Sequence, residues 1–276
     1  MIAKLEESQY MRIQPLFHEL RYNLLIDSIL DGNNRASVYA DNPAKPKSAL
    51  IWNKQEALLV AGEVTNDAFN NDLRTVVLEE ITPDGRLHDV PELVWQYHPK
   101  SWNKILSQTF STLEGSRGLR RYYNFDRPRF NWRNRLPDGH RILPINEALL
   151  ENSGLGSIHQ VAGWIESFWL TREDFFNRSF GYCLVTKDEI LSWCLSVYTS
   201  GKDYELRLAT NPTHKDKGFD TLVAAACVEH CSQRDFTPHW HCWNEDQAAI
   251  AVAEQVGFEN PVKYPVYRMK LISGQN

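Results

Sequence analysis

Cysteines, long uncharged apolar runs and excess positive charge are all scarce or absent in this sequence of 276 residues. Its five cysteines are an odd number and all lie in the C-terminal half, which is typical of a reduced protein rather than a disulfide-stabilised secreted one. No apolar run approaches the roughly 20 residues of a membrane-spanning helix. Residues 1–23 carry scattered charges and no apolar segment like that of a signal peptide. The sequence therefore predicts a cytoplasmic protein that spans no membrane.

Basic residues do not dominate the charge balance. The 30 Lys and Arg residues are outnumbered by 35 Asp and Glu residues, which gives a net charge of -5. Proteins that bind nucleic acids usually carry a basic surface, so this balance argues against a nucleic acid as partner. With 42% hydrophobic and 24% charged residues, the composition is that of a globular protein, and a chain of this length buries a large core without disulfides or a metal.

One stretch, residues 117–141, departs from this balance. It holds eight arginines, no Lys or Glu, only two acids and several interleaved aromatic residues. One interpretation is a contact with phosphate or RNA, because Arg pairs with phosphate while aromatic rings stack on bases. The other is a connector between domains, whose arginines lie over aromatic rings and pair with acids elsewhere in the acidic remainder of the chain. We favour the connector.

Hydrophobic periodicity and turn residues predict helices and short strands in two successive groups. In the N-terminal part we expect a helix through residues 16–29, strands at 36–39, 48–52 and 57–61, and helices at 67–78 and 101–113. Further on we expect helices at 145–150, 158–168, 218–231 and 246–256, strands at 181–186, 190–198, 204–210 and 239–243, and a strand pair within 262–271. We therefore predict an α/β (α+β) fold with two domains, residues 1–141 and 142–276, the second built on a twisted, mostly antiparallel mixed sheet flanked by helices.

Common catalytic and metal-binding motifs are absent. The sequence has no P-loop, no His-Glu-x-x-His zinc motif and no Gly-x-Ser-x-Gly elbow. Residues 227–242 do contain three cysteines and three histidines, all of them residue types that bind zinc. However, Cys227 and Cys231 are spaced for the apolar side of a helix, and His239 and His241 alternate with apolar residues along a strand, so the six side chains do not converge. We predict no metal site.

The most informative stretch is a strand, a short loop and a helix in succession, YELRLATNPTHKDKGFDTLVAAAC from residue 204. The free amides at the start of such a helix can bind a phosphate. Lys215 and Lys217 add positive charge there, and Gly218 allows the backbone to approach a ligand closely. This pattern favours a phosphate-bearing ligand at the loop.

Three more segments accompany this loop in a consistent order. They are SWC at 192–194, PHWHCWN at 238–244 and AEQVGF at 253–258. Together with Thr213–Phe219, they resemble the GCN5-related N-acetyltransferase superfamily, and more narrowly its branch of zwittermicin A resistance acetyltransferases. The loop resembles the family's acetyl-CoA loop, (Arg/Gln)-x-x-Gly-x-(Gly/Ala). The other segments resemble, in turn, the branch's central hairpin, its fifth strand and the helix that closes the family fold.

The resemblance implies an N-acetyltransferase that moves an acetyl group directly from acetyl-CoA, its co-substrate, to an amine of a small molecule. It implies that three residues at the end of the fourth strand pair with the pantetheine arm, namely Leu208, Ala209 and Thr210. It implies that the loop and helix start hold the pyrophosphate, through Lys215, Lys217, Gly218, Phe219, Asp220 and Thr221. Asn244 would line the far side of the cleft. Glu205 would be the base that deprotonates the amine, unless it is an exposed strand residue paired with Arg207 or Lys202.

Some positions depart from the family pattern. Lys215 stands where the family has Arg or Gln, and Asp220 stands where it has Gly or Ala. Asp216 adds a second carboxylate where Gly is usual, and both acids oppose a bound pyrophosphate. Ala253 occupies the place of the family's tyrosine acid. We therefore name Tyr267 as the proton donor; Tyr264 is a second candidate, and core packing is an alternative role for both.

These departures leave alternatives to catalysis open. One is a non-catalytic CoA-binding pseudo-enzyme, and another, less favoured, is an RNA-contacting protein that uses the Arg-rich stretch. The N-terminal domain resembles the domain appended in the same branch, or a degenerate copy of the same fold. The sequence identifies neither the acceptor amine nor the oligomeric state.

Overall fold

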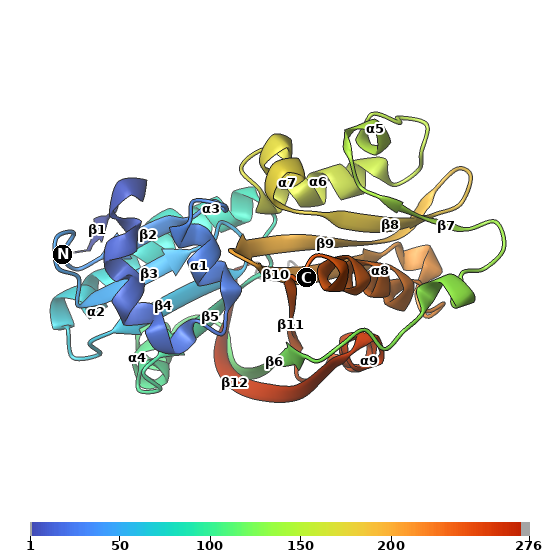
Figure 1. The fold of residues 1–276 in the computed structure, drawn as a ribbon. Coiled ribbons are helices and arrows are strands. Elements are labelled where there is room, and N and C mark those ends of the chain that lie inside the picture. The colour runs from blue at the N-terminus through green and yellow to red at the C-terminus, as the bar shows by residue number, and fades with distance from the viewer. Residues whose placement is uncertain (1, 272–276) are drawn as a thin grey trace. The chain divides into compact units, whose positions relative to one another are not determined.

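Two compact units make up the chain in a computed structural model that describes residues 2–271 (Figure 1). The first unit combines residues up to 119 with residues from 264 on, and the second comprises residues 120–263. The sequence-based boundary at residue 141 falls inside the second unit. Both units are α/β, and each contains a mixed sheet with helices packed on it.

The first unit has a sheet in the order β1-β2-β3-β4-β5-β12. All neighbouring strands are antiparallel except β4 and β5, which are parallel. The strands are β1 (Ala3–Lys4), β2 (Ser37–Ala40), β3 (Ser48–Trp52), β4 (Ala57–Gly62), β5 (Glu92–His98) and β12 (Phe258–Lys270). The helices are η1 (Glu7–Leu20), α1 (Leu24–Leu30), α2 (Asp67–Thr75), η2 (Val76–Ile81), α3 (Thr82–Leu87) and α4 (Trp102–Thr109). The expected strands at 36–39, 48–52 and 57–61 correspond to β2, β3 and β4, whereas β5 was not expected.

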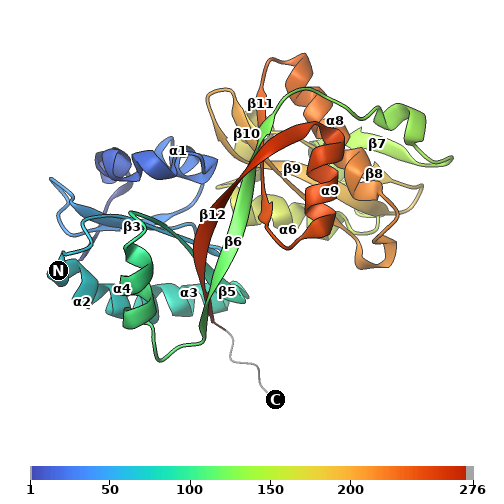
Figure 2. The same ribbon diagram turned by 90° about the horizontal axis from the view of Figure 1, so that it is seen from below.

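The second unit has a sheet in the order β6-β11-β10-β9-β8-β7. Only β10 and β11 are parallel to each other. The strands are β6 (Gly115–Phe125), β7 (Arg141–Pro144), β8 (Gly181–Val185), β9 (Ile190–Ser200), β10 (Asp203–Thr210) and β11 (Thr237–Trp243). The helices are η3 (Trp132–Arg135), α5 (Glu147–Leu150), α6 (Ile158–Phe168), α7 (Arg172–Arg178), η4 (Pro212–His214), α8 (Phe219–Gln233) and α9 (Gln247–Val256). Helices α6 and α7 lie on one face of β8–β10, and α8 packs on the opposite face (Figure 1). Helix α9 lies beside α8 and packs on β11 (Figure 2).

Two long strands each extend over the division between the units. Residues Arg120–Tyr123 of β6 pair with β11 in the second unit, and residues Tyr267–Lys270 of β12 pair with β5 in the first. The structure therefore differs from the sequence interpretation in two further respects. The Arg-rich stretch begins as a sheet strand before it becomes a connector, and the expected strand pair within 262–271 is one continuous strand.

The cysteines lie in the core of the second unit. All five are buried and free, and burial raises the pKa of the Cys183 and Cys231 thiols to about 12. Within residues 2–271, no group of three His, Cys, Asp or Glu side chains is arranged to hold a metal ion. Over the same residues, no helix combines the length and apolar character needed to cross a bilayer.

Candidate functional site

The parallel pair β10 and β11 opens partway along its length. The two strands pair only from Asp203 to Glu205, with Glu205 opposite His239. Beyond that point β10 continues beside β9 as far as Thr210, while β11 continues beside β6 from Trp240 to Trp243. The pairing of β10 with β9 also shifts between Glu205 and Leu206, a bulge of the kind that bends a strand. The diverging strands leave an edge of β10 to which an extended ligand could add as a strand.

A cavity of about 480 Å³ lies at the end of this opening. The end of β10, the following loop, the start of α8 and the start of α9 surround it. Its lining residues are Leu208, Ala209, Thr210, His214, Lys215, Asp216, Gly218, Phe219, Asp220, Asp246 and Ala248. Seven of the twelve residues proposed from the sequence are in this lining. Lys217 and Thr221 instead line a neighbouring cavity.

The loop between β10 and α8 leads into the start of α8, where the first amides have no carbonyl partner within the helix. Gly218 precedes α8 with a φ of 72° and has no atom within 4 Å of the place where a Cβ would be, so the backbone is open to a ligand. Asp216 also has a positive φ, 62°. The Asp220 carboxylate accepts a hydrogen bond from the Thr221 amide at 2.7 Å. One of the amides suited to a phosphate is therefore already bonded to an acid.

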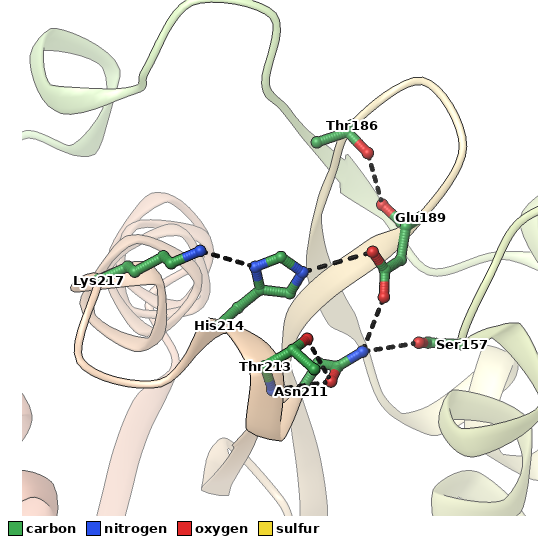
Figure 3. Close-up of polar contacts among 7 residues, drawn as sticks. All are labelled: Ser157, Thr186, Glu189, Asn211, Thr213, His214 and Lys217. Carbon is green, nitrogen blue, oxygen red and sulfur yellow. Dashed lines mark hydrogen bonds and ion pairs between the residues drawn. The ribbon is translucent and has the colours of Figure 1, made fainter.

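A polar network fixes this loop to neighbouring elements (Figure 3). His214 Nε2 lies 3.4 Å from the Glu189 carboxylate, and Lys217 Nζ lies 3.1 Å from His214 Nδ1. Because an ammonium group only donates, we assign Nδ1 as the acceptor and Nε2 as the protonated nitrogen that faces Glu189. Asn211 donates to Glu189 at 2.8 Å and to Ser157 at 3.3 Å. The loop is thus tied to the β8–β9 turn and to the start of α6.

Glu205 lies at the last paired position before β10 and β11 diverge, and it is 2% exposed. Its carboxylate is 3.9 Å from Arg207 Nε and 4.0 Å from His241 Nε2. Glu205 is therefore not exposed, as the alternative expected, but the expected pairing with Arg207 is present. Lys202 pairs with Asp235 instead. His241 is buried on β11, on the same face of the sheet as Glu205. Sequence reasoning treated His241 only as a candidate zinc ligand, because nothing local marks its proximity to Glu205.

Asn244 and Tyr267, like Glu205, line neither of these two cavities. Asn244 follows β11, and its side-chain oxygen accepts a hydrogen bond from Arg121 at 2.7 Å. Tyr267 belongs to the first unit, where it lies opposite Trp95 on β5 within the hydrophobic core. Burial raises the pKa of its phenol, which keeps the hydroxyl protonated. Its assignment as the proton donor stays a prediction.

The family model and the sequence relative that match this chain are both acetyltransferases. The family model described as GNAT acetyltransferase matches residues 14–267. A Bacillus subtilis (strain 168) protein named "Uncharacterized N-acetyltransferase YdfB" is 21% identical over 267 residues, which cover 97% of this chain and 98% of the relative.

Solved structures share the fold over nearly the whole chain. A GCN5-related N-acetyltransferase-like protein from Streptococcus suis 89/1591 has a TM-score of 0.72 at 17% identity, covering 95% of this chain and 99% of that one. A tandem GNAT protein from the clavulanic acid biosynthesis pathway, described as without AcCoA, has a TM-score of 0.58 at 10% identity, covering 100% and 99%.

Proposed function

We propose, because the chain belongs to the GNAT acetyltransferase family, that it transfers an acetyl group from acetyl-CoA to an amine of a small molecule. The observation that carries this proposal is the divergence of β10 and β11 directly beside a loop of free helix amides. An extended pantetheine arm can pair with the main chain of Leu208–Thr210, and a pyrophosphate can accept hydrogen bonds from the start of α8. The carboxylates of Asp216 and Asp220 oppose the binding of the pyrophosphate by charge repulsion.

Glu205 is the residue that we assign as the base. Acetyl-CoA supplies a thioester whose carbonyl carbon accepts the amine nitrogen, so that the C–N bond forms, the C–S bond breaks and the thiolate leaves. The amine attacks only in its neutral form, and Glu205 lies where the strands diverge, so its carboxylate can take the proton that the amine loses. His241 Nε2 lies 4.0 Å from this carboxylate. The role of Tyr267 as donor of a proton to the leaving thiolate stays a prediction from the sequence.

The class of acceptor and the branch of the family to which the chain belongs are also proposals. A small-molecule amine fits the family's chemistry, and the branch of zwittermicin A resistance acetyltransferases remains our prediction from the sequence, as does a cytoplasmic location. A non-catalytic CoA-binding role is the second candidate. It is favoured by three aspartates in the lining of the cavity, Asp216, Asp220 and Asp246.

The test is a measurement of CoA release from acetyl-CoA with a panel of amines, followed by mass analysis of each acceptor. We expect amine-dependent release of the thiol and an acetylated product. Glu205→Gln should lower kcat by about 100-fold or more without changing the melting temperature. Exposed Glu254, changed to Gln, serves as a control and should retain wild-type turnover. CoA binding without turnover on any amine would support the pseudo-enzyme instead.

A further inference from the structure

A third cavity, of about 540 Å³, lies at the outer end of the sheet of the second unit, where β7 is the last strand. It is bordered by the end of β7, the starts of α5 and β8, helix α7 and the last turn of α8 (Figure 1). Its lining residues are Pro144, Ile145, Asn146, Glu147, Ala148, Glu173, Phe176, Asn177, Ser179, Phe180, Gly181, Tyr182 and His230. None of them lines the two cavities at the start of α8.

This cavity is separate from the opening between β10 and β11. The sheet order places β9 and β8 between β10 and β7. Gly218 and His230 stand at opposite ends of α8, and His230 comes 12 residues after Gly218, which corresponds to about 18 Å along a helix. A ligand of this cavity is therefore distinct from the reactants of the proposed acetyl transfer.

The tautomer of His230, one of the lining residues, follows from its neighbours. The Tyr182 hydroxyl lies 2.9 Å and the Arg234 guanidinium 3.3 Å from its Nδ1. Because a guanidinium only donates, Nδ1 accepts and the ring hydrogen is on Nε2. Burial lowers the pKa of His230 to about 4, so the ring is neutral at pH 7. Within residues 2–271 no group accepts the Nε2 hydrogen, which leaves this donor for a ligand that carries an oxygen.

Two carboxylates give the cavity a negative charge. Glu147 is the first residue of α5 and Glu173 the second of α7, and both are exposed. Across the described part of the chain neither forms an ion pair, and the lining holds no Lys or Arg. An acid in the first turn stabilises a helix, which accounts for each glutamate separately. Together they leave two uncompensated charges beside one hollow, which favours a cationic ligand.

Aromatic rings form the apolar part of the lining. The Phe180 ring is stacked on His230 with 3.9 Å between the ring centres, and Phe176 and Tyr182 are half-buried. The faces of aromatic rings attract cations and pack against other rings. A hollow with aromatic walls, a few polar groups and a titratable residue of shifted pKa is typical of a small-molecule site.

We propose that this cavity binds a small organic cation, an ammonium group attached to an aromatic body that carries a hydroxyl. The ammonium group pairs with Glu147 and Glu173. The ring packs against Phe176 and Phe180. The hydroxyl oxygen accepts the Nε2 hydrogen of His230. The site is additional to the acceptor site of the proposed function and does not depend on acetyl transfer.

Ligand-detected NMR titrations without acetyl-CoA, using three matched probes, test this site. Tyramine has the ammonium, the ring and the hydroxyl; tyrosol has an alcohol in place of the ammonium; and 2-phenylethylamine lacks the phenol hydroxyl. Wild type should bind tyramine with a Kd of about 1 mM, as expected for so small a ligand. Tyrosol should bind about fivefold more weakly or worse, and 2-phenylethylamine about threefold more weakly.

Substitutions locate the probe. Glu147→Gln and Glu173→Gln should each weaken tyramine binding about three- to fivefold and leave tyrosol binding unchanged, since one exposed ion pair contributes about that factor. His230→Leu should remove the preference for tyramine over 2-phenylethylamine. Glu151 follows α5, is exposed and lines none of the three cavities, so Glu151→Gln should behave as wild type. Glu205→Gln, at the strand opening, should also retain tyramine binding.

Four results would overturn the site. They are no saturation of wild type by about 20 mM tyramine, equal binding of tyramine and tyrosol, unchanged tyramine binding in the variant that combines Glu147→Gln with Glu173→Gln, or loss of binding in Glu205→Gln, which would place the probe at the strand opening. If the combined variant melted at a lower temperature but bound tyramine as wild type does, the two acids would stabilise only the starts of their helices.

Discussion

Asp220 offers a direct test of where the pyrophosphate lies. Its carboxylate lines the cavity at the end of β10 and accepts the Thr221 amide hydrogen at 2.7 Å. Replacing it by Ala removes a negative charge from the ligand's path and frees one helix amide. Asp220→Asn is the matched variant, because it removes the charge but retains an oxygen for the Thr221 amide.

The size of the effect follows from simple electrostatics. A unit charge at about 6 Å in a water-like dielectric contributes about 0.7 kcal/mol of repulsion per phosphate charge. For the two charges of a pyrophosphate this is about 1.4 kcal/mol, so both variants should bind CoA about tenfold more tightly. An acid in the first turn stabilises a helix by about 0.3–1 kcal/mol, and Ala also loses the hydrogen bond. Asp220→Ala should therefore melt a few degrees lower, and Asp220→Asn should melt closer to wild type.

Calorimetric titration with CoA at low salt and at 0.5 M salt, together with thermal melting, separates these effects. Charge repulsion weakens as salt increases, so the gain in affinity should shrink at high salt. Unchanged affinity in both variants at low salt would refute the reasoning, because the pyrophosphate would then lie away from the start of α8. If the melting temperature changed but the affinity for CoA did not, Asp220 would stabilise only the start of α8 and would not affect the ligand.

Three further predictions concern the second unit. Glu189→Gln should raise the KM for acetyl-CoA about three- to tenfold at unchanged kcat in steady-state kinetics, because it weakens the bonds that orient the loop; a fall in kcat alone would contradict this. Burial, with Arg234 nearby, lowers the pKa of His230 to about 4, so between pH 6.5 and 4 the unfolded chain binds more protons than the folded one. The free energy of unfolding should therefore decrease as the pH falls through this window, by about 1 kcal/mol for a half-buried group. Urea denaturation of wild type and His230→Gln at pH 7 and 4.5 measures this decrease. If the free energy of unfolding fell equally in wild type and in the variant, the prediction would be wrong. Gly257→Ala places a Cβ 1.9 Å from the Arg127 carbonyl oxygen at a φ of 121°, so it should lower the free energy of unfolding by about 3 kcal/mol or more. Gly163 in α6 has open space around it, so Gly163→Ala should instead stabilise the protein slightly in the same urea assay.

The sequence predicted those parts of the site that are encoded locally. The strand β10, the loop and α8 follow one another along the chain, and their alternation, lysines and glycine are visible without a structure. The strands β5 and β6 were missed because their partner strands lie far away in sequence. The sequence of β6 is rich in arginine and has no strand pattern of its own, and only the pairing of Arg120–Tyr123 with β11 identifies it as a strand. The contact of His214 with Glu189 spans 25 residues, and no local pattern predicts it. Side chains that converge across strands are therefore found only in the fold.

The two units share one arrangement, which differs between them at the parallel strands. Each unit has a strand followed by a loop, a helix and a second strand parallel to the first, β4 with β5 and β10 with β11. In the first unit the parallel strands pair over five successive positions, from Ala57 to Ala61, so their main-chain groups bond to each other. In the second unit the pairing ends at Glu205, and the strand edge beyond it is available to a ligand. A ligand arm can add as a strand only where backbone donors and acceptors have no strand partner, and the divergence of β10 and β11 after Glu205 leaves such an edge in the second unit.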